Sequence, residues 1–123
     1  MLNIVNLTPH AVVLRDSTGT DHTYPSAGVA RVEDVVEDAR PIAGLPVPVR
    51  APAKPGPVSG LPAPSEGTAY IVSAIVLAHP DVYGRHDVFA PATGPTDGVI
   101  RGTEPHNKGH ILAVTRLVGV AGA

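Results

Sequence analysis

The sequence predicts a small, mainly β protein: a sandwich or open barrel of short strands, with one short helical segment and a proline-rich loop or arm. Aromatic residues make up only 3% of the chain, so the core has to be built from Val, Ile, Leu and Ala, many of which favour strands. Clusters of Gly, Pro and Asp separate short apolar runs, which is typical of small all-β folds. The amphipathic crossover helices of doubly wound parallel folds are not visible.

The first third of the chain is expected to form short strands. Polar and apolar side chains alternate over residues 3–7, and Pro9 ends this run because proline cannot donate to a β-ladder. Residues 11–14 form a second apolar run, and a turn cluster follows over 16–21. Alternation returns over residues 28–33, which we interpret as a further strand.

A proline-rich excursion separates the two halves of the predicted domain. Residues 41–64 hold many of the 14 prolines, which favours an extended polyproline-like arm. The alternative is a pair of edge strands over 42–49 and 58–61, joined by a tip at 51–57. The acidic segment 32–40, just before this excursion, is the best helical candidate outside the core.

The second half contains the strongest strand of the chain, over residues 68–73. We expect a short buried helical segment over 74–79 to follow it, because Ala and Leu appear there and Gly is absent. Pro80 stops this run. Three further strands are expected, over residues 87–90, 98–102 and 110–118.

Length and charge limit the function classes. The 123 residues suit a single domain spanning 1–123. A net charge of −2 without a run of Lys and Arg argues against nucleic-acid binding, which needs several phosphate contacts. The absence of cysteine excludes disulfides and Cys-ligated zinc. Because residues 1–14 do not resemble a signal peptide and no apolar run reaches the roughly 20 residues of a membrane span, we expect a cytoplasmic protein without membrane partners.

Several short motifs occur in a fixed order along the chain. They are Asn6-Leu7-Thr8-Pro9-His10, residues 25–32, residues 60–64, Gly67-Thr68, Tyr70-Ile71-Val72-Ser73, Arg85 with Asp87-Val88 and Pro91, and Asp97-Gly98. With these motifs the chain resembles a family of small uncharacterised phage, prophage and bacterial proteins that open with Asn-Leu-Thr-Pro-His. The resemblance extends to about Gly102 and implies a phage or prophage setting, but no activity, cofactor or catalytic residue. Thr96 stands where an Arg usually precedes Asp-Gly, and residues 104–109 look like an insertion.

Arginine and histidine side chains near turns are candidates for binding a small anion. Arg31 and Arg85 are suited to bidentate contacts with phosphate or carboxylate, and Gly28 permits a bend that presents backbone amides. Alternatively, Arg85 and Asp87 form an ion pair that fixes a turn. The bend at Thr8-Pro9 either aims His10 at a ligand or is a purely local turn. The candidate ligand-binding residues are His10, Arg31, Tyr70, Ser73, Arg85, His86 and Asp87.

The six histidines raise the question of a metal site. His106 and His110 are four residues apart, but Pro105, Asn107 and Gly109 predict a loop rather than the helix that would place both on one face. We therefore interpret the histidines as solvated or structurally bonded, keep His106 and His110 as the metal candidates, and expect no cofactor.

The sequence favours a non-enzymatic binding module that presents Arg- and His-lined loops to a small anionic, nucleotide-like ligand or to a host protein. In a phage setting this includes sequestration of a host nucleotide signal, as an antagonist of host defence. The alternative is a virion structural or assembly protein that uses its edges and its proline-rich arm. A metal-dependent hydrolase ranks last. Homo-oligomers are expected for the first two, because exposed strand edges offer pairing surfaces.

Overall fold

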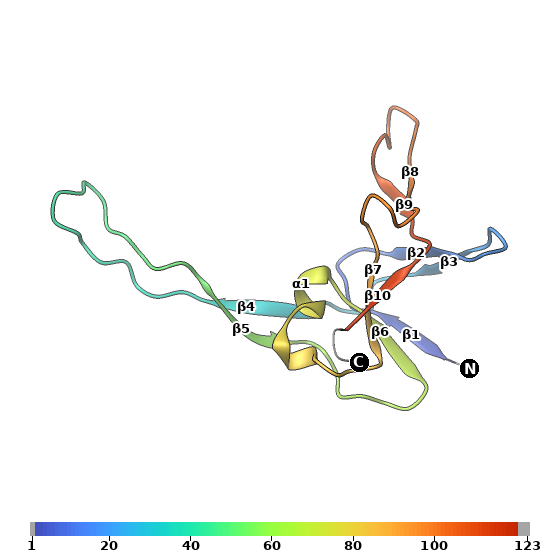
Figure 1. The fold of residues 1–123 in the computed structure, drawn as a ribbon, viewed down its shortest axis with the longest axis horizontal. Coiled ribbons are helices and arrows are strands. Elements are labelled where there is room, and N and C mark those ends of the chain that lie inside the picture. Colours follow the sequence, from blue (N-terminus) through green and yellow to red (C-terminus); the bar gives the residue numbers. More distant parts are fainter. Residues whose placement is uncertain (1, 121–123) are drawn as a thin grey trace.

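The centre of the molecule is a four-stranded sheet, seen in a computed structural model that describes residues 2–120 (Figure 1). Its strands lie in the order β1 (Asn3–Asn6), β6 (Thr68–Ile71), β7 (Val88–Pro91) and β10 (Leu117–Gly119). β1 and β7 both run parallel to β6, whereas β10 runs antiparallel to β7. The first strand of the chain therefore pairs with one from its second half.

A short crossover joins β6 to β7 and packs on the central sheet. It contains α1 (Ala74–Leu77) and the 3-10 turn η1 (Pro80–Val82). Ser73 caps α1, because its side-chain oxygen accepts a bond of 3.4 Å from the backbone N–H of Val76. Val76 and Leu77 are buried. The predicted change from a strand to a helical segment is therefore confirmed, but the helix ends at Leu77 rather than at residue 79, and only half of it is buried.

Two short hairpins extend the structure on the side of β10. One consists of β2 (Val12–Arg15) and β3 (Asp21–Tyr24), and the other of β8 (Ile100–Arg101) and β9 (Ile111–Ala113). The hairpins are joined by backbone hydrogen bonds of 2.9 Å, from Arg15 to Val114 and from Val114 to Val13. The chain is 37% strand and 6% helix, which confirms the mainly β class, and the described residues form four small sheets rather than a closed barrel.

A long hairpin projects from the body and is called the arm, residues 31–59 (Figure 1). Its strands are β4 (Arg31–Val35) and β5 (Lys54–Ser59), and two backbone hydrogen bonds of 2.8 Å between Arg40 and Val49 continue the pairing outward. An arm was one of the expectations. The helix over 32–40 is wrong, because the first part of this segment pairs with β5 as a strand. The alternative edge strands are also wrong, because the arm turns within residues 41–48 and residues 54–57 are strand.

The last predicted strand, 110–118, is divided into β9 and β10. At the break, the Thr115 hydroxyl donates to the carbonyls of Asp97 and Gly98, at 2.9 and 3.2 Å. The next carbonyl, of Arg116, accepts a bond of 3.0 Å from Ala92. At these contacts the chain leaves its pairing with β8 and enters the central sheet. The prediction of one continuous strand over 110–118 is therefore wrong.

Aliphatic side chains between the central sheet and the crossover form the core, as the composition predicted. The buried cluster comprises Leu7, Ala30, Tyr70, Val72, Val76, Leu77, Val82, Val88, Ala90 and Val120. Asn6 is the one buried polar side chain among the described residues. None of the helices in residues 2–120 has the length and apolar character needed to cross a membrane.

Candidate functional site

The opening motif folds into a hydrogen-bonded turn around Asn6. The Asn6 Nδ2 donates to the carbonyls of His10 and Tyr24, at 2.7 and 2.8 Å. Its Oδ1 accepts from the Thr8 backbone N–H at 3.0 Å and from the Thr8 hydroxyl at 2.6 Å. This side chain is 1% exposed, and all its hydrogen-bonding positions are used. Asn6 therefore fixes the backbone at His10 and Tyr24, which line two different cavities.

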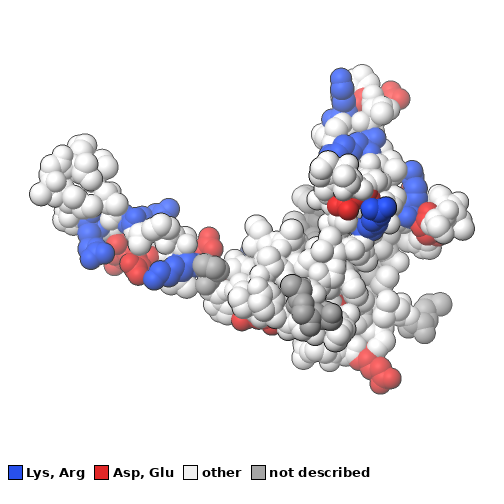
Figure 2. Space-filling model, viewed as in Figure 1, with Lys and Arg blue, Asp and Glu red and all other residues white. Residues whose placement is uncertain are grey.

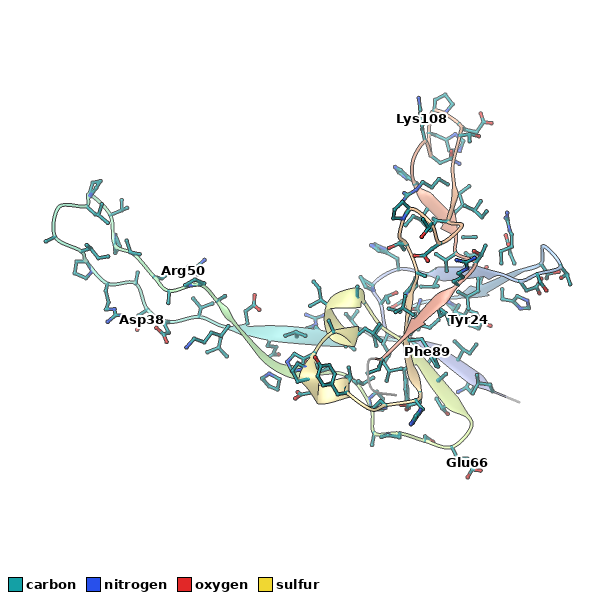
Figure 3. All side chains as sticks on the ribbon, in the orientation of Figure 1. Tyr24, Asp38, Arg50, Glu66, Phe89 and Lys108 are labelled. Carbon is teal, nitrogen blue, oxygen red and sulfur yellow. The ribbon has the colours of Figure 1, made fainter. Side chains whose placement is uncertain are left out.

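The first cavity, called the Tyr24 cavity, lies between the β2–β3 hairpin and the chain entering β10. It has a volume of about 350 Å³ and a mostly apolar lining. Tyr24 stands at the end of β3 on its wall (Figure 3). The lining residues are Leu14, Arg15, Asp16, His22, Tyr24, Val114, Thr115, Arg116 and Leu117.

Two of the basic groups at the Tyr24 cavity are paired with carboxylates. Arg15 makes a bidentate pair with Asp21, with N···O distances of 2.7 and 3.1 Å. His22 Nε2 lies 2.8 Å from Asp16 Oδ2. The Arg15 guanidinium lowers the pKa of Asp21, and the Thr18 hydroxyl together with His22 holds the pKa of Asp16 well below its usual range. Both carboxylates are therefore ionised at neutral pH, and Asp21 is paired with a permanent cation, Arg15.

Arg116 differs from these two groups. Its Nη1 donates to the Thr96 carbonyl at 3.3 Å, a long bond to a neutral acceptor. Within residues 2–120 it has no carboxylate partner within 4.0 Å. A guanidinium in this state, beside an aromatic ring and apolar walls, is available to an anion.

The second cavity, called the two-histidine groove, brings together His10 and His110. It has a volume of about 500 Å³, and its other walls are residues 11–13, Pro91, Thr93 and 111–114. His10 comes from the opening motif, and His110 precedes β9 at the other end of the chain. Among residues 2–120, no group of three or more potential ligands could hold a metal ion. The two exposed imidazoles are suited instead to hydrogen bonds with a bound molecule.

The Arg85 group is brought together as the turn-fixing interpretation predicts. Arg85 donates to both carboxylate oxygens of Asp87, at 2.9 and 2.8 Å, and both side chains are largely buried. The guanidinium carbon also lies 6.0 Å from the centre of the Tyr70 ring. This pairing lowers the pKa of Asp87. Arg85 is thus engaged by a carboxylate, and the neighbouring His86 is exposed.

The remaining predicted residues lie in separate places. Arg31 is exposed at the base of the arm, opposite Ser59, and Ser73 is the cap of α1. His106 is exposed in the loop between β8 and β9. Sequence reasoning missed Tyr24 and Arg116, which are far apart in the chain and line one cavity because β2 pairs with Val114. The opening motif was the available signal for Asn6.

Comparisons with protein-family models, with curated proteins and with solved structures found no match to this chain. The function is therefore inferred from the two cavities and from the arm.

Proposed function

We propose that the chain is a non-enzymatic binding protein of phage or prophage type, which captures a small anionic, nucleotide-like ligand in the Tyr24 cavity. The observation that carries the proposal is that Tyr24, several apolar residues and Arg116 line one cavity of about 350 Å³. Ligand sites are commonly concave and mainly apolar, with a few polar groups that fix orientation, and begin at about 300 Å³.

Each part of such a ligand has a complementary group in the cavity. A planar base can pack on the ring of Tyr24, and a phosphate can accept two parallel N–H bonds from the planar guanidinium of Arg116. Because the present bond from Arg116 to Thr96 is long, at 3.3 Å, its loss costs little when a ligand binds. The acidic neighbour Asp21 is paired with the Arg15 guanidinium, which reduces its repulsion of an anion.

The site is also preorganised, which favours affinity because little has to be ordered on binding. Asn6 holds the Tyr24 carbonyl at 2.8 Å, and backbone pairing of Arg15 with Val114 at 2.9 Å holds the two walls together. The same Asn6 side chain holds His10 at the edge of the two-histidine groove. The opening motif thereby acts as a positioning element for both cavities.

In this proposal the protein works as a homo-oligomer in the cytoplasm of the host cell. The phage or prophage setting comes from the motif resemblance, and sequestration of a host nucleotide signal is the role that fits it. Capture of this kind needs affinity and no chemical step, which suits a cavity lined by a guanidinium that has a carbonyl but no carboxylate partner among the described residues.

Calorimetry with defined probes tests the proposal. We expect AMP and ADP to bind the purified protein, and inorganic phosphate and ribose 5-phosphate to bind more weakly because they leave the Tyr24 ring uncovered. Arg116→Ala is expected to weaken nucleotide binding at least tenfold. Arg101→Ala is the matched control, because Arg101 Nη1 also donates to a backbone carbonyl, that of Gly109 at 2.8 Å, outside the cavity.

Two results would count against the proposal. Nucleotide affinity that is equal in wild type and Arg116→Ala would remove the cavity as the site. Failure of every probe, together with native mass spectra that show no small molecule released from the purified protein on denaturation, would remove ligand capture as the function.

The arm favours a second candidate, a virion structural or assembly protein. Residues 33–50 are exposed throughout, and the arm extends well beyond the body (Figure 1). Extended arms of this kind are suited to contacts with neighbouring subunits. Electron microscopy of the purified protein separates the candidates: open-ended or large symmetric assemblies support the structural role, and small closed oligomers support ligand capture.

A further inference from the structure

The arm is a surface that its own fold leaves uncovered. Large apolar side chains along it are exposed, including Val35 at 54%, Val36 at 55% and Val47 at 64%. Each strand of the outer arm has the other as its sole described pairing partner. An isolated two-stranded hairpin is marginally stable in water, and exposed apolar stretches mark interaction surfaces. These features indicate that the arm is covered by a partner.

The charges of the arm follow a regular order from tip to base. The tip itself is apolar and carries Ile42, Leu45 and Val47, all exposed. Four charged zones follow: Arg40 with Arg50, then Glu37 with Asp38, then Lys54, then Glu33 with Asp34. Arg31 lies beyond them, where the arm joins the body. Figure 2 shows both signs along the arm and an uncharged tip. The second and third zones adjoin, since Lys54 Nζ lies 3.8 Å from Glu37 Oε1.

We infer that the arm binds the arm of a second copy of this chain, side by side and antiparallel. A two-fold axis through the middle of the four charged zones places the zones of the second copy in the reverse order. Each positive zone of one copy then faces a negative zone of the other. Arg40 and Arg50 of one copy then meet Glu33 and Asp34 of the other, and Lys54 meets Glu37 and Asp38. Parallel arms would place like charges together, which disfavours that arrangement.

The same alignment gives the apolar tip a place to bind. The tip lies about eight residues beyond the middle of the four charged zones, or about 26 Å along a strand. An equal distance toward the base passes Arg31, where β4 begins, and reaches the body beyond it. The helix α1 belongs to this body and packs against β4. On α1, Ile75 is 74% exposed. The tip of each copy therefore meets the Ile75 surface of the other. The second copy thus covers both the apolar tip and the exposed apolar side chain near the base of the arm.

This inference specifies the surface of the self-association included in the proposed function, and it does not depend on the ligand. The test is the dissociation constant of the dimer, measured by analytical ultracentrifugation in low salt. Wild type is expected to be dimeric, and Glu33→Arg/Asp34→Arg and Arg40→Glu/Arg50→Glu are each expected to weaken the dimer about tenfold or more. The quadruple variant carries both swaps and restores complementarity, so its dissociation constant is expected to return to within a few-fold of wild type.

A matched control separates the effect of charge positions on the arm from the effect of net charge. Glu66→Arg/Glu104→Arg makes the same change in net charge as the first double variant, at two exposed positions away from the arm (Figure 3 labels Glu66). It is expected to leave the dimer unchanged. Far-UV circular dichroism of every variant checks that the fold is kept.

Three outcomes overturn the inference. They are a monomeric wild type at about 100 μM, a dimer that neither double variant weakens, and a quadruple variant that stays as weak as the doubles. A monomeric wild type would assign the arm to a different protein. AMP titrations keep the two proposals apart: retained AMP binding in a double variant with a weakened dimer leaves the Tyr24 cavity in place, and a wild type that dimerises through the arm but does not bind AMP counts against the cavity alone.

Discussion

Replacing Asn6 tests whether one buried amide holds the opening of the chain together. Asn6→Ala removes the two donor bonds to His10 and Tyr24 and the two acceptor bonds from Thr8. The His10 carbonyl and the Thr8 hydroxyl can still bond each other, at 2.9 Å. The Thr8 N–H loses its acceptor and the Tyr24 carbonyl loses one bond, in a site where Asn6 is 1% exposed. The cost is therefore close to that of two groups left short of a bond.

At roughly 1–3 kcal/mol for each such group, the expected loss of unfolding free energy is about 3 kcal/mol. For a chain of 123 residues, this corresponds to a fall in Tm of about 12 °C. Asn6→Asp is expected to be at least as damaging, because it keeps the acceptor but turns a carboxylate toward the two carbonyls that Nδ2 served.

Urea denaturation followed by circular dichroism measures these changes, at a fixed protein concentration because self-association adds to apparent stability. Asn3→Ala is the control, since Asn3 lies on the same strand and is exposed. A loss below about 0.5 kcal/mol for Asn6→Ala, which is the usual range for surface changes, would refute the role assigned to this side chain.

Two further predictions concern stability. Arg85 lowers the pKa of Asp87, so their pair stabilises the fold above the unfolded carboxyl value of about 3.9 and loses this effect as pH falls through the lower folded value. Asp87→Asn should therefore be less stable than wild type at pH 7 and closer to it near pH 2 in urea titrations; an equal difference at both would contradict the ion pair. Gly60→Ala should lower the Tm more than Gly19→Ala. Both glycines have positive φ, of +79° and +83°, but of the two only Gly60 has an atom in the way of a Cβ, the Val29 carbonyl oxygen at 2.5 Å. Equal thermal shifts would refute the crowding.

Local sequence signals predicted the elements that local forces determine. The apolar run up to Ser73, the Ala and Leu residues after it and Pro80 are neighbours in sequence, and the strand and helical turn they predict are present. The same holds for the Arg85–Asp87 pair, whose members are two residues apart. The aliphatic core followed from composition in the same way.

Elements that depend on distant partners could not be predicted. The acidic segment after Arg31 has helical composition, but pairing with β5 across the arm makes its first part a strand. The break at Thr115 depends on carbonyls of Asp97 and Gly98, which no alternation of residues 110–118 reveals. For the same reason the Tyr24 cavity was missed, because its walls come from both ends of the chain.

The parallel pairing of β1 with β6 has a consequence for how the chain folds during synthesis. Asn3 pairs with Thr68, so the partner of the first strand is made 65 residues later (68 − 3). At about 5–20 residues per second, β1 waits roughly 3–13 s for that partner. Ile4 and Val5 have no β6 to pair with during this interval, while the hairpin of β2 and β3 and then the arm can form from neighbouring residues. The nascent chain thus completes its periphery before its central sheet, and the unpaired first strand is the part that most needs protection from aggregation.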